Sequence, residues 1–180
     1  MKEERESRRS ILHWAAWGSL AALVWPRSAQ ARSNEGDEGE GHPLGTRVAG
    51  SYLASVQHEG FPVALALITL TRDGGFLSND TSDQGANGLV TKDGPVQGAW
   101  KQIGKRRIAA KTLYFAYDPD GIPIWIARTT GQFEFDRTFN AGRGTLTVER
   151  FRLEQDPLDP AETPHDKLEA TLTARRITVD

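Results

Sequence analysis

From residue 46 onward, the chain consists of short runs rich in β-branched and aromatic residues, separated by glycine or proline turns. No segment in this part repeats its apolar residues with helical spacing, so the runs are predicted to be β-strands. Eight strands are expected, at residues 46–57, 62–72, 76–80, 98–104, 106–118, 122–136, 145–155 and 167–179. Because no helix connects any two of them, neighbouring strands must pair antiparallel.

A meander of eight antiparallel strands removes its exposed edges when it closes into a barrel. Residues 73–75 and 118–121 have the composition of hairpin turns. We therefore predict an all-β fold, an eight-stranded antiparallel up-and-down barrel over residues 46–180. A two-layer sandwich is the alternative. It usually needs crossover connections, and only the predicted loops 81–98 and 156–166 are long enough for one.

The first predicted strand contains Gly50-Ser51-Tyr52, which is similar to the G-x-W signature of lipocalins with tyrosine in place of tryptophan. The order of this strand, a DGG hairpin, a GAW strand and a YDPDG hairpin resembles bacterial lipocalin-like barrel proteins. The resemblance covers about residues 46–179. It implies a calycin-type cup that holds a small hydrophobic molecule. The tyrosine-aspartate signature and the partner arginine of animal lipocalins are not matched to any residue here.

Residues 1–31 have the three-part layout of a secretory signal peptide. Basic residues precede an apolar run at 11–25, and Ala29 and Ala31 form a small-residue cleavage site. The run is shorter than the roughly twenty residues that a membrane-spanning helix needs. We expect cleavage after Ala31, no stable membrane span afterwards, and an exported protein, either periplasmic or secreted.

The segment Ser7-Arg8-Arg9-Ser10-Ile11-Leu12 resembles the twin-arginine signal, which implies bacterial export in an already folded state. An ordinary secretory signal and an uncleaved interfacial anchor are the alternatives. Residues 32–45 are acidic, glycine-rich and nearly free of apolar side chains, so we predict a flexible segment ahead of the barrel.

Composition narrows the classes of function. The chain has 22 basic and 24 acidic residues, a formal net charge of −2, and the predicted signal removes more basic than acidic residues. Such a surface does not attract phosphate backbones, so no nucleic-acid partner is expected. The absence of cysteine excludes disulfides, a thiolate zinc site and a cysteine nucleophile.

Aromatic residues on the predicted strands are the candidate ligand-binding residues. Side-chain alternation places Trp125 and Phe133 on one face of their strand, and Tyr114 and Phe115 on opposite faces of theirs. A lumen lined by Trp100, Trp125, Phe133 and either Tyr114 or Phe115 would hold an apolar ligand by burial and ring stacking. The alternative is that these aromatic rings simply form the core.

Arg128 is a charged residue embedded in an apolar strand, and its guanidinium suits a carboxylate of a ligand. The alternative is an outer-face position, solvated or paired with Glu134 or Glu149. The histidines lack metal-ligand spacing, and no nucleophile elbow or phosphate loop is present. No metal, cofactor or catalytic residue is therefore predicted.

These features leave three candidate functions. The first is non-enzymatic binding of a small hydrophobic molecule in the barrel interior, and it is the one we favour. The second is a cofactor-independent isomerase or cyclase of the allene oxide cyclase-like barrel type, which works by shape and one or two polar groups. The third is an inert structural barrel.

Both faces of the predicted strands are apolar near the 118–121 turn. Because a barrel wall buries only one face in its lumen, something is expected to cover the outer one. A partner subunit or the 81–98 loop would do so, and we hypothesise a homodimer through this hairpin.

Overall fold

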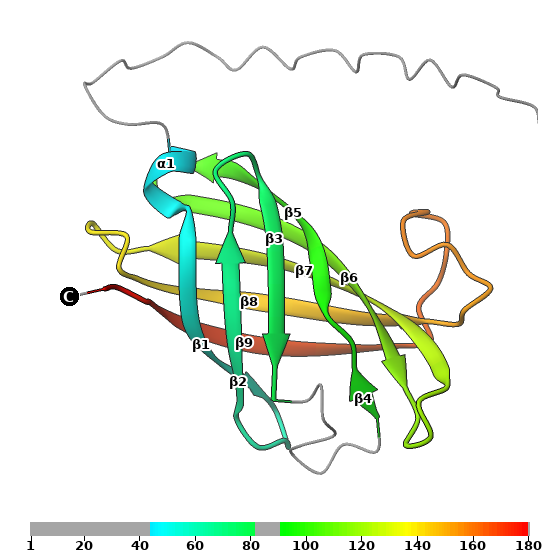
Figure 1. The fold of residues 1–180 in the computed structure, drawn as a ribbon. Helices are drawn as coiled ribbons and strands as arrows, with labels where there is room; N and C mark the ends of the chain where they lie inside the picture. Colours follow the sequence, from blue (N-terminus) through cyan, green and yellow to red (C-terminus); the bar gives the residue numbers. More distant parts are fainter. Residues whose placement is uncertain (1–43, 82–90, 180) are drawn as a thin grey trace, which may run out of the picture. The chain divides into compact units, whose positions relative to one another are not determined.

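Residues 44–81 and 91–179 are described in a computed structural model of the chain (Figure 1). They form one short helix and nine strands. The elements are α1 (Leu44–Val48), β1 (Gly50–His58), β2 (Ala64–Leu70), β3 (Gly75–Asp80), β4 (Lys92–Asp93), β5 (Val96–Gly104), β6 (Arg107–Tyr117), β7 (Pro123–Phe135), β8 (Ala141–Phe151) and β9 (Asp166–Arg176).

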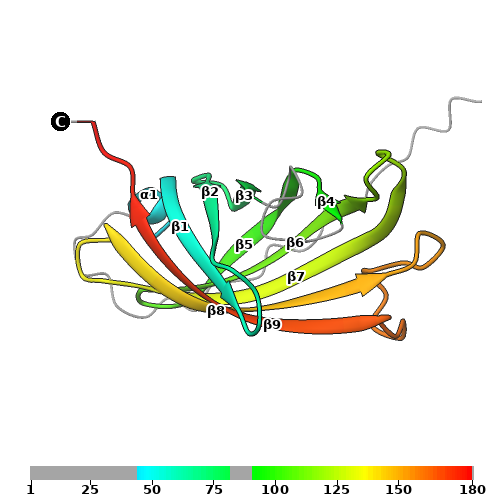
Figure 2. The ribbon, with the colours of Figure 1, turned by 90° about the horizontal axis from the view of Figure 1, so that it is seen from below.

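Eight of the strands close into an antiparallel barrel. Apart from β4, each strand pairs with the next along the chain, and β9 pairs with β1 so that Tyr52 lies opposite Arg176. Figure 2 shows the sheet curving round until β9 meets β1. The predicted eight-stranded up-and-down barrel is confirmed, and the sandwich is excluded because the sheet has closed on itself.

The ninth strand, β4, continues the line of β5 along β6. Asp93 lies opposite Ala116, and the amide of Gly94 donates to the carbonyl of Phe115 at 2.7 Å. Pro95, which has no amide hydrogen, separates β4 from β5. The sequence predicted only a loop here, because a strand of two residues has no periodic pattern to detect.

Glycines allow neighbouring strands to approach closely. A Cβ atom at Gly98 would lie 2.1 Å from the carbonyl oxygen of Lys111, and one at Gly144 would lie 2.4 Å from that of Gln132. A side chain at either position would push two paired strands apart. These glycines therefore permit the strong bending that a small barrel needs.

The helix α1 lies at one end of the barrel (Figure 1). Its Leu44 and Val48 are buried in the core, and the hydroxyl of Tyr52 donates to the carbonyl of Val48 at 2.7 Å. The prediction of a strand from residue 46 is wrong at its start, because the chain makes a helical turn before β1 begins at Gly50.

Arg176 connects the chain segments that meet at this end of the barrel. Its guanidinium lies over the Tyr52 ring at 5.2 Å and donates to the Tyr52 hydroxyl at 2.8 Å. It also donates to the carbonyls of Ala49 at 3.0 Å and Phe139 at 3.2 Å. Arg176 is therefore the partner of Tyr52. The sequence analysis did not identify this pair, because Tyr52 lies on the first strand of the barrel and Arg176 on the last.

The turn before β8 also differs from its predicted place. The strand predicted at residues 145–155 is wrong in its bounds, since β8 runs from Ala141 to Phe151. The turn lies just before it, where the Asp136 carboxylate accepts from the amides of Thr138 and Asn140, each at 3.1 Å. Such short-range aspartate bonds define a turn without any glycine.

The barrel interior has two halves of different filling. The half next to α1, here called the closed half, holds large side chains: Tyr52, Phe76, Trp100, Ile108, Phe133, Phe135 and Phe139. The half next to the β1–β2 turn, here called the open half, has small buried residues on its walls: Ala64, Ala66, Ala116, Ala127 and Ala170. Small side chains on facing walls leave space between them.

Candidate ligand-binding site

A cavity of about 150 Å³ lies inside the barrel, mainly in the open half. Its deeper wall is apolar and includes Ala66, Ile68, Phe76, Phe133, Leu146 and Leu172. The rings of Phe76 and Phe133 lie 6.3 Å apart and form the floor, beyond which the core of the closed half begins. An apolar cavity of this kind favours an apolar occupant.

A row of inward-facing residues crosses four strands near the mouth of the cavity. In register, Tyr114 on β6 lies opposite Ala127 on β7, Ala127 opposite Arg150 on β8, and Arg150 opposite Asp166 on β9. Ala127 is fully buried, and its small side chain leaves room for the larger groups of Tyr114 and Arg150. Strand pairing therefore brings polar groups together that are far apart in the sequence.

Arg150 and Asp166 form a two-point ion pair in this row. Nε of Arg150 donates to Oδ1 of Asp166 at 2.7 Å, and a second guanidinium nitrogen donates to Oδ2. This bond raises the pKa of Arg150 above its ordinary value, although burial opposes the shift. The guanidinium is a permanent cation whose charge Asp166 balances.

Tyr114 contributes a hydroxyl group to the cavity lining. Burial raises the pKa of this phenol well above its ordinary value; the nearby carboxylates of Asp93 and Asp80 add to the shift, and Arg150 opposes it. At neutral pH the hydroxyl is therefore protonated and able to donate a hydrogen bond. Within residues 44–81 and 91–179, it donates none to another side chain or carbonyl.

Two further carboxylates line the mouth. Asp80 is the last residue of β3 and Asp93 the last of β4, and both are partly buried. Both also act electrostatically on Tyr114. The mouth is thus acidic, whereas the floor is apolar.

His58 lies on the rim at the end of β1. Its Nδ1 atom is buried and has no hydrogen-bond partner among the described residues. Its ring meets Phe61 edge-on at 6.3 Å, and Nε2 of Gln57 donates to the carbonyls of His58 and Phe61. The β1–β2 turn therefore presents a defined rim to the cavity.

The structure brings only two of the predicted ligand-binding residues to the cavity, Tyr114 and Phe133. Trp100 lies in the core of the closed half, and its indole nitrogen donates to the carbonyl of Thr71 at 3.1 Å. Trp125 stacks on His165 with ring centroids 4.7 Å apart and does not line the cavity.

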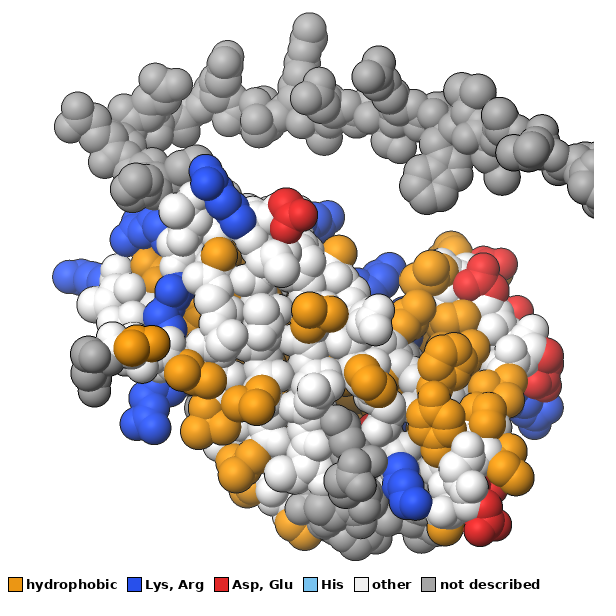
Figure 3. All heavy atoms as spheres, in the orientation of Figure 1, with side chains coloured by type: hydrophobic (Ala, Val, Ile, Leu, Met, Phe, Trp, Pro, Cys, Tyr) orange, Lys and Arg blue, Asp and Glu red, His pale blue; other side chains and the backbone are white. Residues whose placement is uncertain are grey.

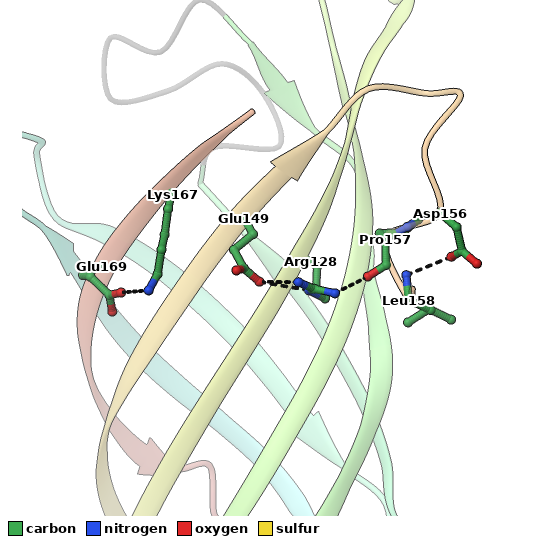
Figure 4. Close-up of polar contacts among 7 residues, drawn as sticks. All are labelled: Arg128, Glu149, Asp156, Pro157, Leu158, Lys167 and Glu169. Atoms are coloured by element: carbon green, nitrogen blue, oxygen red, sulfur yellow. Dashed lines mark hydrogen bonds and ion pairs between the residues drawn. The ribbon is translucent and has the colours of Figure 1, made fainter. Parts of the chain in front are cut away.

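Phe115 and Arg128 lie on the outside of the barrel. Phe115 is 49% exposed. Of the two neighbouring aromatic residues, Tyr114 is therefore the one that faces inward. Arg128 pairs with Glu149 at 2.9 Å, as one of the sequence alternatives had it, and donates to the carbonyl of Pro157 (Figure 4). The guanidinium also covers the ring of Phe151 at 4.8 Å.

These contacts fasten the loop 152–165 to the outer face of the barrel. Phe151 lies two residues after Glu149 and therefore on the same outward face of β8, yet it is completely buried. Pro157 is buried as well. The sequence predicted that something covers an apolar outer face near this end. Part of that cover is the 152–165 loop, which the sequence reading did not consider.

The charged residues of the mouth were missed by sequence reasoning. A signal for one of them exists, because Arg150 shares its alternation face with Leu146 and Val148, both of which line the cavity. A charged residue on the apolar face of a strand is a candidate for a lumen position. No comparable signal marks Asp93, because β4 is too short.

No cluster of three or more histidine, aspartate or glutamate residues within the described ranges is arranged to hold a metal ion. In the same ranges, no helix is long and apolar enough to cross a bilayer.

Two of the predicted segments cannot be compared with the structure. The predicted signal peptide at 1–31, and residues 32–43 of the predicted flexible segment, lie outside the described residues. The chain matches no family model, no curated protein and no solved structure.

Proposed function

We propose that this chain is an exported lipocalin-like protein that binds one small hydrophobic molecule inside its barrel. One observation carries this proposal: the open half of the interior is hollow and apolar, whereas the closed half is filled by aromatic side chains. Filling this hollow would stabilise a barrel whose only role is structural, because an empty cavity forfeits packing contacts. The twin-arginine type of signal and the exported location remain part of this proposal.

The size of the cavity limits the ligand. A dry apolar cavity of about 150 Å³ in another protein accepts benzene, whereas pockets for drug-sized ligands reach about 300–1,000 Å³. The cavity here has about the volume of the first kind. We therefore favour a single ring or a short branched chain over a long lipid.

The expected affinity follows from that size. At roughly −0.5 to −1 kcal/mol per non-hydrogen atom, a ligand of about eight such atoms binds with a Kd between millimolar and micromolar. Binding of this strength is suited to a reversible carrier.

Filling the cavity tests the proposal. Ala66 is buried on the cavity wall, so Ala66→Leu should weaken binding of toluene by about tenfold or more, measured by NMR titration. Leu67→Phe is the matched control, because Leu67 is 55% exposed on the same strand and should leave binding unchanged. Wild-type protein that binds neither toluene nor any molecule retained from its host would refute the proposal and favour the inert barrel.

A cofactor-independent isomerase or cyclase is the second candidate. The observation in its favour is Tyr114, a protonated hydroxyl in an apolar cavity beside a cation, Arg150. Such a donor can stabilise negative charge that develops on a substrate oxygen. One variant distinguishes the two functions. If the protein is an enzyme, Tyr114→Phe should abolish turnover of a host-derived ligand. If it is a carrier, the same variant should leave toluene binding nearly unchanged.

We also propose a homodimer through the hairpin at 118–121. Figure 3 shows hydrophobic side chains gathered over the end of this hairpin and the nearby loop. Among the exposed ones are Phe115, Ile122 and Leu158. Sedimentation at micromolar concentration should give a dimer that Ile122→Asp converts to monomer. A wild-type monomer under the same conditions would end this part of the proposal.

A further inference from the structure

Tyr114 stands between the apolar floor of the cavity and its polar mouth. The inward-facing residues of β6 run from Ile108, in the core of the closed half, through Thr112 to Tyr114 and Ala116. Thr112 and Tyr114 both line the cavity, and Tyr114 is partly buried. The phenol therefore enters the cavity from the side wall, above the rings that form the floor.

The hydroxyl of Tyr114 differs from that of Tyr52, the other inward-facing tyrosine described above. The Tyr52 hydroxyl donates to the carbonyl of Val48 at 2.7 Å and accepts from Arg176 at 2.8 Å. In the part of the chain that the structure describes, the Tyr114 hydroxyl makes no such bond. An unpaired hydroxyl in a buried site costs free energy, so a molecule in the cavity gains by supplying its partner.

The partner that the Tyr114 hydroxyl requires is a hydrogen-bond acceptor. Burial keeps the pKa of this phenol well above its ordinary value, so the group carries its proton at neutral pH. A protonated phenol has one O–H to donate. A ligand made only of carbon and hydrogen would leave this donor unsatisfied.

The surroundings of the hydroxyl favour a neutral acceptor over an anion. The cation in the same row, Arg150, is already balanced by Asp166, which accepts from its Nε and from a second nitrogen. A ligand carboxylate would have to displace Asp166 or remain buried without a counter-ion, and both are unfavourable. Between Tyr114 and Arg150 lies Ala127, whose small side chain leaves room for a compact polar group.

Resting on the binding function proposed above, we propose that the ligand is a small neutral carbonyl compound, a ketone or aldehyde on an apolar ring or short chain. Its oxygen accepts a hydrogen bond from the Tyr114 hydroxyl, in the space over Ala127. Its apolar part lies against Phe76 and Phe133 at the floor. Burial of the apolar part supplies most of the affinity, and the hydrogen bond fixes the orientation of the ligand.

The test compares benzaldehyde with styrene. The two molecules share one ring, one planar shape and the same number of non-hydrogen atoms, and only benzaldehyde has an oxygen that can accept. Dissociation constants for the full mature chain are measured by NMR titration. Tyr114→Phe should lower the affinity for benzaldehyde relative to that for styrene by about fivefold or more, because the buried oxygen loses its donor.

Tyr117→Phe is the matched control. It makes the same chemical change on the same strand, but Tyr117 does not line the cavity, so the affinity ratio should equal that of the wild type. Infrared spectroscopy gives a second readout. The carbonyl stretching band of bound benzaldehyde should lie at a lower wavenumber in the wild type than in Tyr114→Phe, because a hydrogen bond weakens the C=O bond.

The outcomes separate the two proposals. If the wild type binds styrene, and Tyr114→Phe has the same affinity ratio and the same carbonyl band, the carbonyl proposal is overturned and cavity binding stands. An equal fall of the ratio in Tyr117→Phe would also overturn it. Failure of benzaldehyde, styrene and toluene to bind would overturn both proposals. If Tyr114→Phe does not fold, the wild type decides: a carbonyl band at its position in hexane would exclude the hydrogen bond.

Discussion

The two halves of the barrel interior have the same alternation of inward and outward side chains, but the inward residues differ in size and charge. In the closed half, large rings fill the lumen, and α1 and Arg176 close over Tyr52. In the open half, alanines line the walls and charged residues stand at the mouth. A barrel can therefore separate the part that stabilises the fold from the part that is free to bind.

This contrast predicts that equal substitutions have unequal effects. Removing a large side chain from the closed half should reduce stability, because it leaves a void in a packed core. Changing the mouth should alter binding more than stability. Four measurements test it, beginning with the largest expected effect.

Phe135→Ala in the closed half should lower the free energy of unfolding by about 4 kcal/mol, because the Phe135 ring is buried and packs against Tyr52 and Phe139. Phe115→Ala, on the exposed outer face, should cost less than about 1 kcal/mol. Urea denaturation followed by circular dichroism measures both. Similar losses for the two variants would mean that the closed half is not the main source of stability.

Arg176→Ala should lower the free energy of unfolding by about 2–3 kcal/mol, because it leaves the Tyr52 hydroxyl and the carbonyls of Ala49 and Phe139 without their donor. The adjacent Arg175 is exposed, so Arg175→Ala is the control and should change stability by less than about 0.5 kcal/mol. The same denaturation experiment applies. An unchanged Arg176→Ala variant would show that α1 closes the barrel without its arginine.

The smallest effect concerns pH. Burial raises the pKa of both Tyr52 and Tyr114 in the folded state. Above the unfolded pKa of about 10, the unfolded chain loses phenolic protons that the folded chain retains, so stability should fall as pH rises. This alkaline loss should be smaller in Tyr114→Phe than in the wild type.

Spectrophotometric titration at 295 nm gives a second measurement of the same group. Tyr114→Phe should leave the ionisation seen between pH 10 and 11 in the folded protein unchanged, because Tyr114 does not titrate there. A loss of amplitude in that range would mean that Tyr114 is solvated, and the proposed apolar cavity would then be in doubt.

Much of the fold could be predicted from local pattern. The runs of β-branched residues and the turns at 73–75 and 118–121 were enough to predict eight antiparallel strands and to favour a barrel over a sandwich. Predicted boundaries are wrong where side-chain hydrogen bonds, rather than glycine or proline, form the turn. The turn at Asp136 before β8 is an example. The helical turn α1 is too short for any periodic signal.

The site could be predicted only in part. Alternation identified the pair of faces that contain Tyr114 and Phe133, but not which face is inner. It also offered Arg128 as the charged residue, whereas the structure places Arg128 outside and Arg150 inside. Both arginines lie on apolar strands, and only the closed barrel distinguishes the lumen from an outer face covered by a loop.

The sequence by itself determined that this chain is all-β with eight antiparallel strands, because period-two patterning and turn composition act over a few neighbouring residues. The choice between a barrel and a sandwich was decided by the closed sheet. Tertiary structure decided which end is filled and which is hollow, and which charges meet at the mouth. The physical reason is that strand register brings Tyr114, Arg150 and Asp166 into one row, and register is a property of the whole closed sheet.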